Sequence, residues 1–529
     1  MAGAVHGWRE PTPRIVTPSA RELPWYSRVR KFPAETKHYL RWKRSFDIIV
    51  SLLILPALLP LIALCCVAAI GGFLFGFDSG VINGTVDALA KAFGTHAAGT
   101  GFAVASVLLG CAVGAFGAGR LADALGRRPT MLLNAILFLV TAVATGAATS
   151  AAFFIVARIT AGLAIGGASV LAPMYIAEVA PAHVRGRLAS LQQMAIVVGL
   201  FSAFVSNALI ARVAGGPSDI FWFGAPAWRW MFWMEAVPAV TFLLGSMTIP
   251  ESPRYLVFVG KRERAREVFR RIGGDADQLV RQVEQTLEAE RPPRMSDLII
   301  PGTRRIAPVL WVGMGLAVFQ QFVGINVIFY FGEILWKAAG ATEQWALRIN
   351  VLTGLVNILA TIPAIMLIDR IGRKPLLLVG SIGMTLTLGA MAAAFATADA
   401  GPDGKPVLSH AAAVAGLTAA NLYIVAFAVS WGPVMWVLLG EMFPNQVRGA
   451  ALAVSGATNW VANFAVTVTF LPLLSAVGLA GAYGFYAAAA AISLPFVWAA
   501  VRETKGKTLE QMKDTTILNQ SPTALKNFV

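Results

Sequence analysis

The sequence has little charge and almost no cysteine. Only 13% of its 529 residues are charged, whereas a soluble globular domain carries about 25%. This shortage excludes an ordinary water-soluble fold. The three cysteines, Cys65, Cys66 and Cys111, all lie in apolar runs. We expect free structural thiols there, because neither a disulfide framework nor a metal site is indicated.

Long apolar runs make up most of the chain. Hydrophobic residues account for 57% of it, and about twelve runs of roughly 20 residues are long enough to cross ~30 Å of hydrocarbon as helices. A soluble core could bury two or three such helices, but not twelve. The sequence therefore predicts an all-α membrane protein with twelve transmembrane helices. The runs are centred near residues 68, 108, 139, 163, 200, 238, 320, 357, 385, 426, 462 and 490.

Basic residues lie at alternate ends of the predicted helices. Residues 1–44 contain ten Lys and Arg, and the stretch from 254 to 305 is also basic, whereas the loop at 149–152 carries no charge. Because basic loops stay in the cytoplasm, we expect a multi-pass protein of the cytoplasmic (inner) membrane with both termini cytoplasmic. The net charge of +15 then reflects topology, and no nucleic-acid partner is expected.

Two motifs occur twice. "DALGRRP" at 123–129 returns as "DRIGRKP" at 369–375, and "AEVAPAHVRG" at 177–186 returns as "GEMFPNQVRG" at 440–449. Such internal repetition predicts two pseudo-symmetric six-helix bundles. We expect a basic, disordered tail over 1–47, a first bundle over 48–250, a cytoplasmic linker with short helices over 251–305, a second bundle over 306–501 and a cytoplasmic tail over 502–529.

Further motifs carry a family resemblance, which covers about residues 60–515. The arrangement resembles the major facilitator superfamily (MFS), and the motifs resemble those of its sugar porter family. The resemblance implies the MFS fold and a secondary transporter for a monosaccharide. The motifs are "GRLADALGRR" (119–128), "PMYIAEVAP" (173–181), "PESPRYL" (250–256), "QQFVGIN" (320–326) and "SWGPVMWVLLGEMFP" (430–444).

Three primary amides interrupt an apolar run in "FQQFVGIN". An unsatisfied amide in hydrocarbon costs several kcal/mol. Either sugar hydroxyls or another helix would satisfy these groups, and the family resemblance favours sugar. Two tryptophans offer a face for a sugar ring to stack on, or they pack in the fold. The candidate sugar-binding residues are Gln193, Gln320, Gln321, Asn326, Trp431, Trp436 and Asn463, with Asn459 as a weaker candidate.

Asp78, in "GGFLFGFDSG", is a carboxylate in an apolar run. Such a residue costs about 2.5–3.5 kcal/mol at a helix centre and is functional by default. Arg158 in the fourth span is its expected partner, and the two together are candidates for proton coupling. The alternative places Asp78 at the outer end of its span, where it would be solvated.

The charged residues of the repeated motifs are expected to form a conformational latch at the cytoplasmic ends of the helices. Ion pairs there would hold the outward-open state and break when that side opens. A purely topological role for the arginines is the alternative. The residues are Asp123 with Arg127, Glu178 with Arg185, Asp369 with Arg373, and Glu441 with Arg448.

The sequence therefore predicts a secondary active transporter that imports a monosaccharide, a hexose or a pentose, with protons by alternating access. Its partners would be the sugar, the proton and the lipid bilayer, and it would function as a monomer without a cofactor. The alternatives are a facilitative uniporter without proton coupling and a transporter-like sugar sensor. Residues 43–64 also resemble the membrane entry of polyprenol-phosphate sugar phosphotransferases, but no catalytic domain follows, so we expect no enzyme. The particular sugar stays open.

Overall fold

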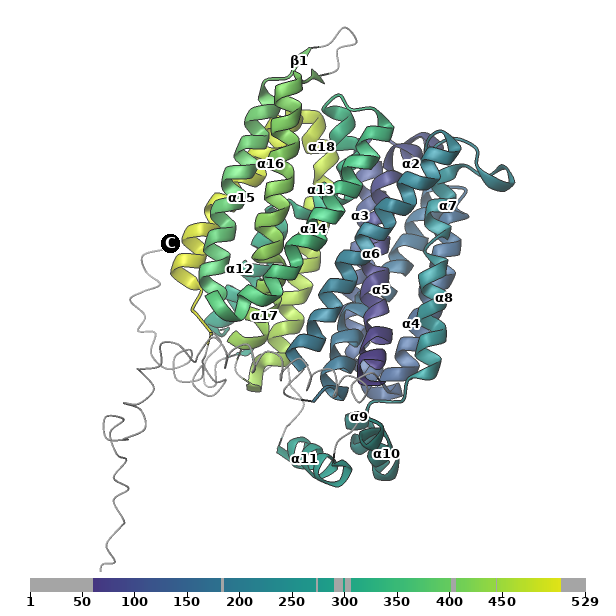
Figure 1. Ribbon diagram of the computed structural model, residues 1–529, viewed down its shortest axis with the longest axis vertical. Helices are drawn as coiled ribbons and strands as arrows, with labels where there is room; N and C mark the ends of the chain where they lie inside the picture. Colours follow the sequence, from purple (N-terminus) through teal and green to yellow (C-terminus); the bar gives the residue numbers. More distant parts are fainter. Residues whose placement is uncertain are drawn as a thin grey trace, which may run out of the picture. The chain divides into compact units, whose positions relative to one another are not determined.

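The computed structural model describes residues 60–181, 185–272, 275–289, 298–299, 306–400, 406–443 and 445–505 (Figure 1). The expected tail over 1–47, the chain from 48 to 59 and the residues from 506 onward lie outside this description. Helices dominate the described residues. A short antiparallel pair, β1 (Asp399–Ala400) with β2 (Pro406–Val407), is the one two-stranded sheet among them.

Eleven of the described helices are long and apolar enough to cross a membrane. The last of them, Val447–Ala500, has 54 residues, which at about 1.5 Å per residue is more than twice the thickness of a bilayer core. Its backbone leaves the helical region at Gly478, where φ is 67°. This break divides it into two spans, so the predicted twelve crossings are confirmed.

The first half contains six spans. The first is Pro60–Gly84, which ends in the 3-10 helix η1 (Ile82–Gly84) and is followed by α2 (Val86–Phe93). A further 3-10 turn, η2 (Trp222–Gly224), precedes the sixth span, which consists of α7 (Ala227–Trp233) and α8 (Ala236–Thr248). The four spans between are α3 (Ala97–Leu125), α4 (Arg127–Gly146), α5 (Ala151–Val179) and α6 (Arg185–Ala214).

The second half repeats this plan with two broken spans. One consists of α12 (Pro308–Phe322) and α13 (Ile325–Ala338), separated at Gly324, whose φ of 83° ends the first helix. The other consists of α16 (His410–Val429) and α17 (Trp431–Met442), separated at Ser430. The remaining spans are α14 (Glu343–Ile371), α15 (Arg373–Ala396) and the two in α18 (Asn445–Ala500).

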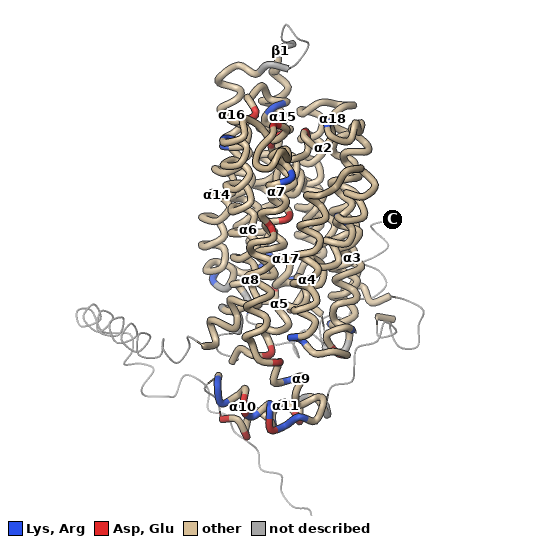
Figure 2. Tube along the Cα trace, turned by 90° about the vertical axis from the view of Figure 1, so that its right-hand side faces the viewer, with Lys and Arg blue, Asp and Glu red and all other residues tan. Residues whose placement is uncertain are grey.

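Three short helices follow the first half: α9 (Pro253–Phe258), α10 (Arg262–Ile272) and α11 (Ala276–Ala289). Their apolar residues form a small cluster around Leu256, Val268 and Phe269. Charged residues are concentrated along α10 and α11, in contrast with the spans (Figure 2). This is the predicted helical linker. We call the end of the spans where it lies the linker end, and the opposite end the far end.

The two halves turn in the same way at the first repeated motif. The chain passes from α3 to α4 at Gly126 with φ of 102°, and from α14 to α15 at Gly372 with φ of 106°. Only glycine adopts such angles readily, which accounts for glycine in "LGRRP" and "IGRKP". The next residue, Arg127 or Arg373, begins the following helix in each half.

Helices α3 and α5 approach closely through glycines. A methyl group on Gly162 would lie 2.0 Å from the backbone oxygen of Val107, and one on Gly110 would lie 1.9 Å from that of Ile159. Small residues let membrane helices bring their backbones together in this way. The same packing fixes Arg158, one turn before Gly162, relative to α3.

Gly162→Ala is therefore expected to lower the free energy of unfolding by about 1–3 kcal/mol, because overpacking forces the two backbones apart. Thermal unfolding of the purified protein in detergent measures this. Gly117→Ala is the matched control, since a methyl group on Gly117, also in α3, has no neighbour within 4 Å. Equal melting temperatures for the two variants would contradict the close approach.

Two pairs of helices contribute to the contact between the two halves. Helix α3 lies against α18, where a methyl group on Gly101 would come within 3.0 Å of the Val468 carbonyl oxygen and the rings of Phe102 and Phe464 meet edge to face. Helix α6 lies against α14, where Gly354 faces Phe204. These four helices thus hold the two halves together along their length.

Candidate functional site

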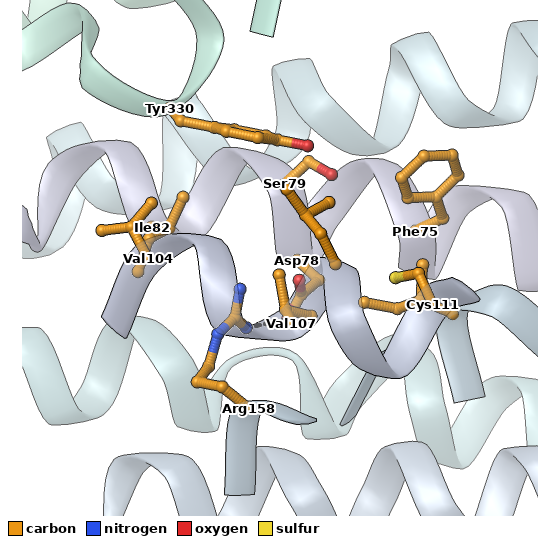
Figure 3. Close-up of a pocket in the computed structure, with 11 residues that line it drawn as sticks. Phe75, Asp78, Ser79, Ile82, Val104, Val107, Cys111, Arg158 and Tyr330 are labelled. Carbon is orange, nitrogen blue, oxygen red and sulfur yellow. Dashed lines mark hydrogen bonds and ion pairs between the residues drawn. The ribbon is translucent and has the colours of Figure 1, made fainter. Parts of the chain in front are cut away.

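Asp78 and Arg158 form a buried ion pair in the first half. Each residue is 1% exposed, and Arg158 Nη1 donates to Asp78 Oδ1 (Figure 3). The ring of Phe232 also lies near the guanidinium, 5.8 Å from its carbon to the ring centroid. Asp78 is therefore shielded from solvent in this conformation, unlike the solvated carboxylate of the alternative interpretation.

Sequence analysis missed a second carboxylate beside this pair. Glu235, between α7 and α8, is 3% exposed and interacts electrostatically with both Asp78 and Arg158. The guanidinium thus pairs with Asp78 and also interacts with a second buried carboxylate. The signal was present in the sequence, because "WMFWMEAVPAV" is another apolar run with one acid. A carboxylate in such a run is costly and functional by default, as for Asp78.

A small cavity adjoins the ion pair. Its lining includes Asp78, Ser79 and Phe75 of the first span, Cys111 of α3 and Arg158 of α5. Tyr330 of α13 closes it from the second half, with its hydroxyl directed toward Ser79 (Figure 3). The cavity therefore connects the buried charges of one half with a helix of the other.

The amides of "FQQFVGIN" form one hydrogen-bonded network. Gln321 Nε2 donates to Asn459 Oδ1 at 3.1 Å and to Gln320 Oε1 at 3.3 Å, and Asn326 Nδ2 donates to Gln321 Oε1 at 2.6 Å. Asn459 Nδ2 donates to Gln320 Oε1 at 2.7 Å. The break at Gly324 brings Asn326 back toward Gln321, which a continuous helix would not do. The structure thus brings together three predicted residues and Asn459.

The other predicted sugar contacts are spread around this network. Asn463 is 3% exposed and accepts from Thr467 Oγ1 at 3.1 Å, while the Tyr330 hydroxyl faces it. Gln193 is half-buried, whereas the amide of the preceding Gln192 packs on Gly72 inside the first half. Of the adjacent glutamines, Gln193 is thus the more exposed.

The two predicted tryptophans differ in exposure. Trp436 is 43% exposed. Trp431 is fully buried, and its indole nitrogen donates to Ser381 Oγ at 2.9 Å and to the Leu377 carbonyl at 3.2 Å. Its own carbonyl accepts from Gln320 Nε2 at 3.2 Å. Trp431 therefore supports the amide network in this conformation and offers no free face.

Trp460 was also missed. It directly follows Asn459, is 6% exposed and lies 5.7 Å from Phe75, centroid to centroid. This contact joins the amide network of the second half to the cavity wall of the first. The sequence signal was the Asn-Trp pair itself, which places an aromatic ring one residue from a buried amide.

At the linker end, Arg127 and Arg373 form matching ion pairs. Arg127 Nε and Nη2 each lie 2.9 Å from a Glu178 oxygen, and Nη1 lies 3.1 Å from Asp123 Oδ1. Arg373 Nε and Nη2 donate to Glu441 at 2.9 and 2.7 Å. Such bidentate pairs are the strong kind. Each glutamate is thus bound by the arginine of the other repeated motif, a partner that sequence analysis did not assign.

The remaining predicted latch residues are Arg185, Asp369 and Arg448. The side chains of Arg185 and Asp369 lie outside the description. The Arg448 guanidinium donates to the Phe443 carbonyl at 3.1 Å.

Two further glutamates cap helices in these networks. Glu251 of "PESPR" accepts from the backbone N–H of Arg127 at 2.9 Å, and Glu503 of "RETKG" accepts from that of Arg373 at 3.0 Å. Burial acts to raise the pKa of Glu503, but backbone N–H donors, including those of Arg373 and Lys374, hold it below its ordinary value. A carboxylate at a helix N-terminus is favoured by the same donors. Glu251 and Glu503 thus occupy equivalent positions in the two halves, a correspondence that the repeated motifs did not reveal.

Comparison with known proteins agrees with this architecture. A family model described as "Sugar (and other) transporter" matches residues 64–515. The glucose transport protein of Synechocystis is 52% identical over 450 residues, covering 84% of this chain and 95% of that protein. The D-xylose-proton symporter of Escherichia coli K12 is 37% identical over 482 residues, covering 84% and 94%.

A solved structure, the partially occluded inward-open xylose transporter of E. coli, superimposes with a TM-score of 0.73 at 34% identity. The match covers 85% of this chain and 99% of that one. Fold and site together define a multi-pass membrane transporter. The chain belongs to the sugar transporter family of the major facilitator superfamily, as the motifs predicted.

Proposed function

We propose that this protein imports a monosaccharide, a hexose or a pentose, together with protons by alternating access. The observation that carries the proposal is the buried Asp78–Arg158 pair beside a cavity that Tyr330 of the second half closes. The E. coli relative, whose name states xylose-proton symport, and the Synechocystis relative, whose name states glucose transport, support it.

In this proposal Asp78 carries the proton. A proton on its carboxylate removes the charge that holds Arg158, and the guanidinium would then turn toward Glu235, the other buried carboxylate that interacts with it. This exchange of partners changes the packing between the first span and α5. Because the same cavity touches α13, the change reaches the second half and lets the halves rock.

The sugar would bind to the amide network and its surroundings. Amides both donate to and accept from hydroxyls, and a half-exposed indole offers an apolar face to a sugar ring. Trp431 would act through Gln320, whose amide its carbonyl holds. We propose direct contacts from Gln193, Gln320, Gln321, Asn326, Trp436 and Asn463.

The ion pairs at the linker end would act as the latch. Each pair lies within one half, so it fixes the ends of three helices as one body. We place the linker end in the cytoplasm, since the basic linker helices lie there, and we propose that both termini are cytoplasmic as well. We further propose that the protein lies in the inner membrane, functions as a monomer, is no enzyme, and has the five-segment division that the sequence predicts.

The test uses purified protein in liposomes that enclose a pH-sensitive dye, with glucose, xylose, galactose, arabinose and inositol supplied in turn. We expect one or more sugars to drive proton entry. Asp78→Asn is expected to abolish sugar-driven proton entry while sugar exchange continues. Asp219→Asn, in an exposed loop, is the control and should behave as wild type. Sugar entry without proton movement would show a uniporter and overturn the coupling.

A further inference from the structure

The far ends of the two halves are joined through Asn83 of η1. Its Nδ2 donates to the Phe329 carbonyl at 2.8 Å, and its Oδ1 accepts from the backbone N–H of Glu333 at 2.9 Å and from Asn350 Nδ2 at 2.7 Å. A methyl group on Gly332 would lie 2.8 Å from Asn83 Nδ2. We call this contact between η1, α13 and α14 the far-end gate; here it is closed.

The part of α13 that contacts η1 follows two breaks in the helical backbone. Gly324 ends α12 with φ of 83°, and the backbone of Phe331 leaves the helical region with φ of −120° and ψ of 17°. The residues beyond Phe331, including Glu333, therefore form a short helical piece after a kink. Movement at such joints would separate this piece from η1 without unfolding the rest of the span.

Glu333 stands out in this piece. It is 1% exposed, and neither of its carboxylate oxygens has a hydrogen-bond partner among the described residues. The nearest cation is Lys337 on the same helix, whose Nζ lies 3.7 Å from Oε1, beyond hydrogen-bond distance. An ionised carboxylate without a donor is costly to bury.

The charges around Glu333 balance its negative charge poorly. Lys337 Nζ lies 2.5 Å from Asp87 Oδ2 of α2 and 3.7 Å from Glu343 Oε1 of α14. Asp87 and Glu343 are the charged groups that interact with Glu333 from the neighbouring helices. Three carboxylates thus surround one ammonium group. A proton on Glu333 would supply the missing donor and remove one negative charge.

We propose that Glu333 is a second proton-binding site, which holds a proton while the far-end gate is closed and releases it when α13 moves away from η1. Raising the pH on that side then favours the open gate, and lowering it favours closure. The inference rests on the proposed alternating access, but it does not require proton coupling at Asp78.

The experiment measures how far the two halves separate at the far end. Spin labels are attached at His96→Cys, before α3, and Gln344→Cys, in α14, both exposed at the far end, with the three native cysteines replaced by serine. Distance distributions are recorded without sugar between about pH 5.5 and 8.5. In the protein with native Glu333 we expect the ratio of open to closed molecules to rise with pH, by at most about tenfold per unit for one proton.

Glu333→Gln, which mimics the protonated acid, should stay closed at every pH. Glu263→Gln, in the exposed part of the linker, should keep the full dependence. Asp78→Asn should also keep it, which separates this site from the proposed coupling site. The proposal is overturned if Glu333→Gln keeps the dependence, if Asp78→Asn abolishes it, or if native Glu333 shows none. Failure of sugar-proton coupling would leave this measurement unaffected.

Discussion

Arg158→Met is expected to lower the free energy of unfolding by about 3–5 kcal/mol and to abolish proton-driven uptake. Removing one partner of a buried ion pair leaves an uncompensated charge of that cost. Here Asp78 would lose its ion-pair partner, and Glu235 would lose a positive charge that interacts with it. Asp78→Asn should be milder, because Arg158 keeps Glu235 as a counter-charge. Thermal or denaturant unfolding in detergent, together with uptake in liposomes, measures both effects.

Arg120→Met is the control for Arg158→Met. Arg120 is exposed in α3 and lies over the ring of Phe116, so its loss removes a similar side chain without unpairing a buried charge. We expect its stability to change by less than about 1 kcal/mol, as for most exposed charges. If Arg158→Met and Arg120→Met had the same melting temperature, the interactions of Arg158 with Asp78 and Glu235 would not stabilise the fold as the geometry indicates.

Gln321→Leu is expected to weaken sugar binding by about 10- to 100-fold. Gln321 is one of the proposed direct contacts, and its amide can both donate to and accept from sugar hydroxyls. Its loss would leave a bound hydroxyl without a partner, and each unsatisfied buried group costs about 1–3 kcal/mol. Titration calorimetry of the purified protein, with the sugar that the liposome panel identifies, measures the dissociation constant.

The control for Gln321→Leu is Gln192→Leu. Gln192 is also a buried amide, but it packs on Gly72 within the first half, away from the network. We expect its sugar affinity to equal that of wild type. A role in joining helices alone would give the opposite pattern for Gln321→Leu, with a lower melting temperature and an unchanged dissociation constant.

The sequence alone predicted the architecture. Hydrocarbon demands about 20 apolar residues per crossing, so the runs could be counted, and glycine at Gly126 and Gly372 marked equivalent turns because few other residues adopt those angles. The repeated motifs predicted two similar halves, and their order indicated the family. Isolated polar residues in apolar runs, such as Asp78 and Gln321, could be recognised because the membrane makes each of them costly.

Tertiary structure alone decided which of these groups meet. Sequence analysis could apply the cost of burial to one residue at a time, but a partner on another helix leaves no periodic signal. Arg127 binds Glu178, 51 residues away, and the backbone N–H of Glu333 binds Asn83, 250 residues away. The positions of Glu235 beside Arg158 and of Trp460 against Phe75 likewise depend on how the helices pack, because hydrophobic patterning fixes which segments cross the membrane but not how they are rotated against each other.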